Sequence, residues 1–182
     1  MTLTLSAPPL LLHRILCQHG ITLRPIKAGD NDAMRDVIIA VLTEYGCIGP
    51  GYACNDPETQ AMSAAYDGVT GQYWVIEDPE GTVLGGGGFS QLKGTNPSDG
   101  IAELQKVYFS PQLRGLGLGK QILTLAIEGA RSAGYRTLYA ETVPHMIHAI
   151  GLYERLGFEL LNAPLGNTGH AERCTTRYAL HL

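Results

Sequence analysis

The stretch from Gln112 to Lys120 combines glycines with an arginine and a lysine, a composition suited to holding an anion. Its glycines, at positions 115, 117 and 119, alternate with leucines, and a run with helical apolar spacing follows at once. Glycine allows a positive φ and lacks a Cβ, so successive backbone N–H groups can converge on one point. The first turn of a helix adds unpaired N–H groups and the positive end of the helix dipole. Residues 112–120 therefore predict a site for a phosphate or pyrophosphate.

Two common phosphate-binding motifs do not fit this spacing. A Walker A loop has four residues between its first glycine and its Gly-Lys pair, which Ser or Thr follows. Here three residues separate Gly115 from Gly119, and Gln121 follows Lys120. The dinucleotide fingerprint G-x-G-x-x-G belongs directly after a strand, early in a βαβ unit, and these glycines have different offsets. Glycines that only packed a helix start against a sheet would not explain the flanking basic residues.

A third pattern matches. Gln112-x-x-Gly115-x-Gly117, preceded by ELQKVYFSP at 103–111, closely resembles the acetyl-coenzyme A signature of the GNAT acyltransferase family. AIGLYERLGF at 149–158 resembles that family's A-x-x-L-Y-E-K-x-G-F segment. The order of predicted elements over 21–182 also matches, so the resemblance covers about nine tenths of the chain. It implies an α/β (α+β) GNAT-like fold, a mixed, mainly antiparallel twisted sheet of about seven strands flanked by about four helices.

The resemblance implies acetyl-coenzyme A as co-substrate and no metal. The N–H groups of residues 114–120 would cradle the pyrophosphate, and backbone N–H groups at the end of strand 107–109 would polarise the acetyl carbonyl. In this family that strand splays from the one at 139–142, which leaves a slot for the pantetheine arm. Met146 stands where the family often has an asparagine that contacts this arm. The implied cofactor-binding residues are Val107, Tyr108, Phe109, Gln112, Arg114, Gly115, Leu116, Gly117, Leu118, Gly119, Lys120 and Met146.

Glu103 and Tyr153 are the candidate catalytic residues, because acyl transfer to an amine needs a base for the amine and an acid for the thiolate. Tyr153 matches the family tyrosine that can protonate the thiolate, although tyrosines on inward helical faces are usually core residues. Glu103 lies on a central strand, where an unpaired carboxylate is costly and burial would raise its pKa. A hydrogen-bonded structural role fits Glu103 about equally well. Glu141 and Tyr108 are weaker candidates.

The elements that must position these residues follow from periodicity and breaker residues. Strands are predicted at 21–24, 73–77, 82–90, 101–109, 136–141, 158–161 and 175–182. Helices are predicted over 30–45 and 56–66, with Asp30 and Asp56 as N-caps, from the glycine loop to 133, and over 144–156. Four consecutive glycines at 85–88 indicate a bulge or a close approach of backbone or ligand. The strand–helix–strand unit over 101–141 predicts a right-handed crossover.

The acceptor site is expected between residues 47–56, the glycines at 85–88 and the loop at 165–170, which also carries Thr168. A plain surface connection fits 47–55 equally well. Carboxylates at Glu44, Asp56 and Glu58 favour a cationic amine, the primary amine of a small molecule or a peptide. The acceptor-binding candidates are Tyr52, Asn55, Asn167 and His170.

Length and composition set the remaining bounds. A chain of 182 residues suits one domain, which we assign to 21–182, with residues 1–20 as an N-terminal extension that is either disordered or a short added helix. The net charge of −4 argues against a nucleic-acid partner. Scattered cysteines without a CxxC pair indicate reduced thiols in a cytoplasmic protein and no metal site. No signal peptide or membrane segment is expected, and the resemblance adds a homodimer through the last strands as a possibility.

Two function classes follow, and the first is favoured. An N-acetyltransferase would use both Glu103 and Tyr153, whereas a non-catalytic acyl-CoA-binding sensor would need neither. A third hypothesis is a nucleotide-binding protein, which would have affinity for ATP or NAD.

Overall fold

The computed structural model describes residues 20–66 and 69–182, and its centre is a seven-stranded sheet in the order β1-β2-β3-β4-β5-β7-β6. The strands are β1 (Thr22–Pro25), β2 (Gln72–Glu77), β3 (Val83–Gln91), β4 (Ile101–Phe109), β5 (Thr137–Thr142), β6 (Glu159–Leu161) and β7 (Thr176–His181). All neighbouring strands pair antiparallel except β4 and β5, which are parallel. The predicted mixed, mainly antiparallel sheet is confirmed. The predicted N-terminal extension lies outside the described residues except for Gly20.

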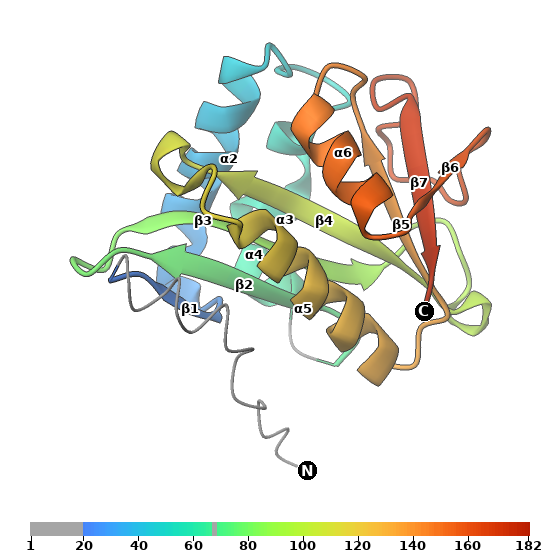
Figure 1. The fold of residues 1–182 in the computed structure, drawn as a ribbon, viewed down its shortest axis with the longest axis horizontal. Coiled ribbons are helices and arrows are strands. Elements are labelled where there is room, and N and C mark those ends of the chain that lie inside the picture. The colour runs from blue at the N-terminus through green and yellow to red at the C-terminus, as the bar shows by residue number, and fades with distance from the viewer. Residues whose placement is uncertain (1–19, 67–68) are drawn as a thin grey trace.

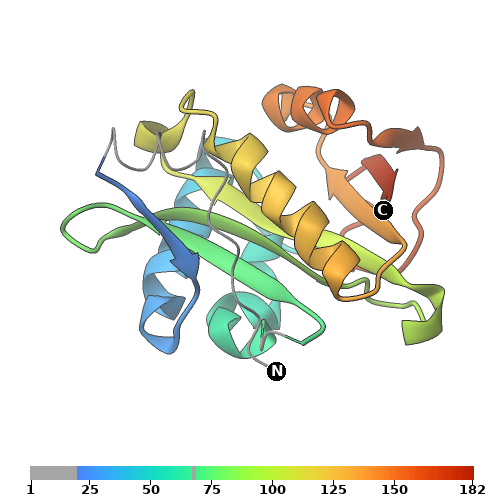
Figure 2. The same cartoon turned by 60° about the horizontal axis from the view of Figure 1, so that its bottom comes forward.

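Helices cover both faces of this sheet. They are α2 (Asn31–Glu44), α3 (Pro57–Gln60), α4 (Met62–Ala65), α5 (Leu118–Ser132) and α6 (Ile147–Arg155). Figures 1 and 2 show α5 and α6 on one face and α2, α3 and α4 on the other. Apolar residues at helical spacing bury one side of each long helix, such as Ile122 and Ala126 of α5 and Met34 and Ile38 of α2. Within the described part of the chain, no helix has the length and apolarity needed to cross a membrane.

The prediction of a single helix over 56–66 is wrong: two short helices, α3 and α4, lie there instead, so the described residues hold five α-helices. α3 ends at Gln60, because the next residue, Ala61, has a φ of −146° and a ψ of 54° that break the helix. Asp56 precedes α3 but makes no side-chain cap; its carboxylate instead binds side chains from elsewhere in the fold. The side chain of Asn31 in α2 accepts a hydrogen bond of 2.9 Å from the Ser63 N–H. Long-range contacts outweigh helix propensity here.

The glycines of β3 make room for a tyrosine. A Cβ at Gly86 or Gly88 would overlap both the backbone of β2 and the buried ring of Tyr73. The Tyr73 hydroxyl donates a hydrogen bond of 2.6 Å to the carbonyl of Lys106 in β4. Lys106 has a φ of +52°, and the β3–β4 register shifts between Gly86 and Gly88. Both predicted consequences of the glycine run, a bulge and a close approach, are therefore confirmed.

β4 and β5 part after a short parallel ladder. Pairing covers only Ile101 to Glu103 on β4 and Thr137 to Tyr139 on β5. Beyond it the two strands diverge, as Figure 1 shows. The expected splay is thus present, and Glu103 sits at its fork.

Candidate functional site

A cleft of about 620 Å³ lies between the end of β4, the start of α5 and α6. Two of the twelve predicted cofactor residues are outside it: Gln112 is exposed, and Leu116 packs against the core. The other ten line the cleft: Val107, Tyr108, Phe109, Arg114, Gly115, Gly117, Leu118, Gly119, Lys120 and Met146. The fold thus brings the glycine loop, the end of β4 and the start of α6 around one space.

The glycine loop presents free donors to this cleft. Gly115 and Gly117 have left-handed φ values of +78° and +79°, and Gly117 is the N-cap of α5. Within residues 20–66 and 69–182, the backbone N–H groups of residues 115–120 have no carbonyl partner. Such donors at a helix start, beside the positive end of its dipole, fit a phosphate or pyrophosphate group.

Arg114 holds the glycine loop in place rather than adding a free positive charge to the cleft. Its guanidinium donates two hydrogen bonds of 2.6 Å to the carboxylate of Glu44, the last residue of α2. The hydrogen bond from Arg114 holds the pKa of Glu44 below its usual value. Its Nε also donates to the carbonyl of Phe109 at 3.2 Å. The side chain therefore ties α2, β4 and the loop together, whereas Lys120 is exposed beside the cleft.

A second cavity of about 250 Å³ adjoins the cleft, and Tyr108 and Met146 line both. Of the predicted acceptor residues, Tyr52 and His170 line this cavity. Asn55 and Asn167 are exposed outside it. The Asn55 amide donates to the Gly49 carbonyl at 2.5 Å, and the Asn167 N–H donates to the carbonyl of Lys93 at 2.8 Å. The two asparagines thus shape the loops around the cavity.

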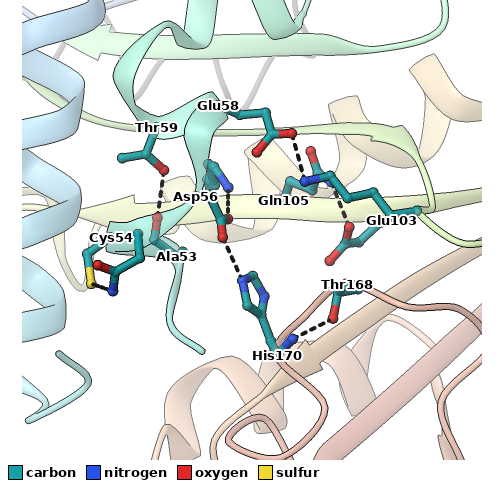
Figure 3. A network of polar contacts seen from close by, with 12 residues as sticks. Ala53, Cys54, Asp56, Glu58, Thr59, Glu103, Gln105, Thr168 and His170 are labelled. Atoms are coloured by element: carbon teal, nitrogen blue, oxygen red, sulfur yellow. Dashed lines mark hydrogen bonds and ion pairs between the residues drawn. The ribbon is translucent and has the colours of Figure 1, made fainter. Parts of the chain in front are cut away.

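A chain of charged groups crosses the wall of the small cavity (Figure 3). The carboxylate of Asp56 accepts hydrogen bonds from Lys106 Nζ at 2.5 Å and from His170 Nε2 at 2.8 Å. His170 Nδ1 lies 3.6 Å from Glu141, whose carboxylate also accepts a hydrogen bond from Thr168. The bond to Asp56 raises the pKa of His170. Burial would raise the pKa of Asp56, but its bonds to His170 and Lys106 hold that pKa below the usual value.

This network corrects the expected charge of the acceptor site. The sequence predicts Asp56 as a helix cap and as one of three carboxylates that attract a cationic amine, yet its carboxylate is already hydrogen-bonded by Lys106 and His170. Glu58 is paired with Lys93 at 2.7 Å, and Glu44 with Arg114. Lys106 was not identified from the sequence, because a lysine inside a strand carries no signal of burial. The three carboxylates are therefore balanced by cations instead of forming an acidic site.

The two candidate catalytic residues lie in the two adjoining cavities. Glu103 lines the smaller one and is only 7% exposed; burial, with a smaller contribution from nearby Glu141, raises its pKa to about 7. Tyr153 of α6 lines the larger cleft, packs against the rings of Phe158 and Tyr178, and has its pKa raised by burial. The expected burial of Glu103 and its raised pKa are both present.

Comparisons with known proteins agree on one family. The sequence model of the Acetyltransferase (GNAT) family matches residues 41–158. "Uncharacterized N-acetyltransferase YjgM" of Escherichia coli K12 is 43% identical over 161 residues, which cover 88% of this chain and 94% of that protein. An L-methionine sulfoximine/L-methionine sulfone acetyltransferase of Pseudomonas aeruginosa is 36% identical over 86 residues, 47% of this chain and 49% of that protein.

A solved structure shares the fold. It is a GNAT superfamily phosphinothricin acetyltransferase of Sinorhizobium meliloti in complex with AcCoA. The two folds superpose with a TM-score of 0.68 at 22% sequence identity, over 89% of this chain and 88% of that one.

Proposed function

The chain belongs to the GNAT family of acetyltransferases, and from this membership we propose that it transfers the acetyl group of acetyl-coenzyme A to the primary amine of a small molecule. The amine attacks the thioester directly, with both substrates bound. One observation carries the proposal: a cleft with an anion-binding loop and a cavity with a buried glutamate meet at Tyr108 and Met146. Free thiols at Cys47, Cys54 and Cys174, within the described residues, agree with a cytoplasmic protein.

The larger cleft is the proposed donor site. The free N–H groups of residues 115–120 would hold the pyrophosphate, and the stretch of β4 that diverges from β5 would offer backbone N–H groups to the acetyl carbonyl. Met146, at the start of α6, would contact the pantetheine arm in place of an amide side chain. The bound co-substrate supplies the activated acetyl thioester; the protein supplies position and proton transfer.

Glu103 is the proposed base. A primary amine is a cation at neutral pH and must lose a proton before or during attack. A carboxylate with a pKa near 7 accepts that proton more readily than an ordinary glutamate, yet is about half ionised at neutral pH. Glu103 reaches the amine directly or through one water molecule.

Tyr153 is the proposed acid for the departing thiolate. Replacing Tyr153 with phenylalanine is expected to lower kcat about tenfold, which is less than the usual 10²–10⁴-fold effect of an acid catalyst because a thiolate is itself a weak base. Tyr178→Phe is the matched control, since that ring touches Tyr153 but its hydroxyl binds Glu154 at 2.9 Å. Steady-state rates of coenzyme A release measure both. Equal rates for Tyr153→Phe and the wild type would assign Tyr153 to the core alone.

The acceptor cavity favours a small molecule that carries both signs of charge. Its volume of about 250 Å³ is below the roughly 300–1,000 Å³ of pockets for drug-sized ligands. Lysines and a histidine line it together with carboxylates. One relative is named for acting on L-methionine derivatives. We therefore favour a small amino acid or a close analogue as the acceptor.

A panel of acceptors tests this function. Coenzyme A release should be fastest with L-amino acids and with L-methionine sulfone. It should be slower with amino acid methyl esters, which lack the carboxylate, and slowest with peptides. If the protein binds coenzyme A but acetylates no amine of the panel, the proposed enzymatic activity is overturned and an acyl-CoA sensor is favoured instead.

A further inference from the structure

The side chain of Gln105 lies beside Glu103 on the same face of β4 (Figure 3). Its Nε2 donates a hydrogen bond of 2.6 Å to Oε2 of Glu103. Its Oε1 accepts two hydrogen bonds, from the Tyr66 hydroxyl at 2.8 Å and from the Ser90 hydroxyl at 3.0 Å. The amide thus connects the glutamate to two hydroxyl donors on other parts of the fold.

The two hydroxyls fix which way this amide points. Tyr66 is 6% exposed and burial raises the pKa of its phenol, so it stays a donor. Turning the Gln105 amide over would aim its oxygen at the Glu103 carboxylate, and two acceptors would face each other. The observed orientation is therefore the one that matches an ionised Glu103. A hydrogen bond to a charged acceptor is stronger than one to a neutral acceptor.

We propose that Gln105 is a positioning residue for Glu103, which holds the carboxylate in one orientation at the acceptor cavity and stabilises its ionised form, with Tyr66 and Ser90 locking the amide. The inference rests on the proposed function insofar as Glu103 is the base. Gln105 itself does not exchange a proton; it acts through the glutamate.

Other groups near Glu103 set the background against which Gln105 works. They come from the residue that follows α4, from β4 and β5, and from the loop before β7, and they are Tyr66, Lys106, Tyr139, Glu141, His170 and Cys174. Burial and the charge of Glu141 raise the pKa of Glu103, whereas the hydrogen bond from Gln105 and the charges of Lys106 and His170 lower it. Without the hydrogen bond from Gln105, burial would raise the pKa of Glu103 further, and the carboxyl would stay protonated to a higher pH.

Direct titration of Glu103 tests this without any substrate. Carbon-13 NMR of the full chain with labelled glutamate carboxyls, with the Glu103 signal assigned from Glu103→Gln, gives the titration midpoint. We expect a midpoint near 7 in the wild type and one higher by about one pH unit in Gln105→Leu. Gln105→Met serves as a second variant that also lacks the N–H donor. The double variant Tyr66→Phe/Ser90→Ala should move the midpoint in the same direction by less.

Gln72→Leu is the matched control. Gln72 is a half-buried glutamine of β2 whose side chain faces Gly129 of α5, on the other side of the sheet. Its loss should leave the Glu103 midpoint unchanged. An unchanged midpoint in folded Gln105→Leu and Gln105→Met would overturn the inference.

The rate profile separates this inference from the proposed function. The acid side of the pH dependence of kcat/KM should move up with the NMR midpoint in Gln105→Leu, while the rate at high pH falls much less. If the midpoint moves but Glu103→Gln keeps full activity, the positioning of Glu103 by Gln105 is supported and the proposed role of Glu103 as base is overturned.

Discussion

Replacing Glu103 with glutamine is expected to lower kcat/KM about 10²–10⁴-fold, the usual range for loss of a general base. The amide has nearly the shape of the carboxyl and can still accept the hydrogen bond from Gln105 Nε2, so the geometry of the cavity changes little. What is lost is the group that takes the proton from the amine. In the wild type, kcat/KM should rise as pH increases through about 7, where Glu103 ionises, and this rise should be absent in the variant.

The same substitution should stabilise the fold. The pKa of Glu103 is raised in the folded chain to about 7 from an ordinary value of 4.5. Ionising the buried carboxyl therefore lowers the free energy of unfolding. This loss of stability begins as pH rises above 4.5 and is complete above about 7. Glutamine has no charge to bury, so Glu103→Gln should gain up to about 3 kcal/mol at high pH and nothing below the unfolded pKa. Urea unfolding at about pH 4 and about pH 8 measures both values.

Glu77→Gln is the contrasting control. Glu77 of β2 binds Arg24 at 2.5 Å, and this bond lowers the pKa of the carboxyl. Its contribution is present above the unfolded pKa and is lost as pH falls, so the glutamine variant should be less stable at about pH 8 and fully active. Glu103→Gln with full activity at that pH would remove Glu103 from catalysis.

The sequence predicted best those features in which the backbone conformation limits which amino acid can occupy a position. Gly115 and Gly117 have the positive φ that their pattern suggested, and the glycines of β3 lie against a ring and a bulge. β4 begins and ends where predicted, at Ile101 and Phe109, because this stretch is rich in apolar residues and is bounded by Gly100 and Ser110-Pro111. These features are local, so a short window of sequence contains them.

The polar network around Asp56 could not be predicted from the sequence, because its members are far apart along the chain. Asp56 is 50 residues from Lys106 and 114 residues from His170. No periodicity links such positions, and an aspartate before a proline suggests a helix cap on local grounds alone. Gln105 lay within the segment that resembled the family, yet only the fold places two hydroxyls around its amide oxygen.

The double variant Gly115→Ala/Gly117→Ala is expected to raise the KM for acetyl-coenzyme A about 10²-fold. Both positions have left-handed φ values of +78° and +79°, which cost a residue with a Cβ about 1–2 kcal/mol each. Alanines would pull the loop away from this conformation and turn the N–H groups of residues 115–120 away from a common point. Titration calorimetry with coenzyme A measures the loss of affinity, and the KM for the acceptor should change little because its cavity does not include the loop.

Gly134→Ala distinguishes loss of the anion site from general strain. Gly134 follows the other end of α5 with a φ of +88°, and a Cβ there meets nothing within 4 Å, as at Gly115. It should therefore lose stability like a single loop variant while its coenzyme A affinity stays unchanged. Inorganic pyrophosphate should compete with coenzyme A in the wild type and in Gly134→Ala, but only weakly in the double variant. A folded double variant with wild-type affinity would show that the donor is anchored elsewhere, since the free N–H groups are the property of this loop that most directly suits a pyrophosphate.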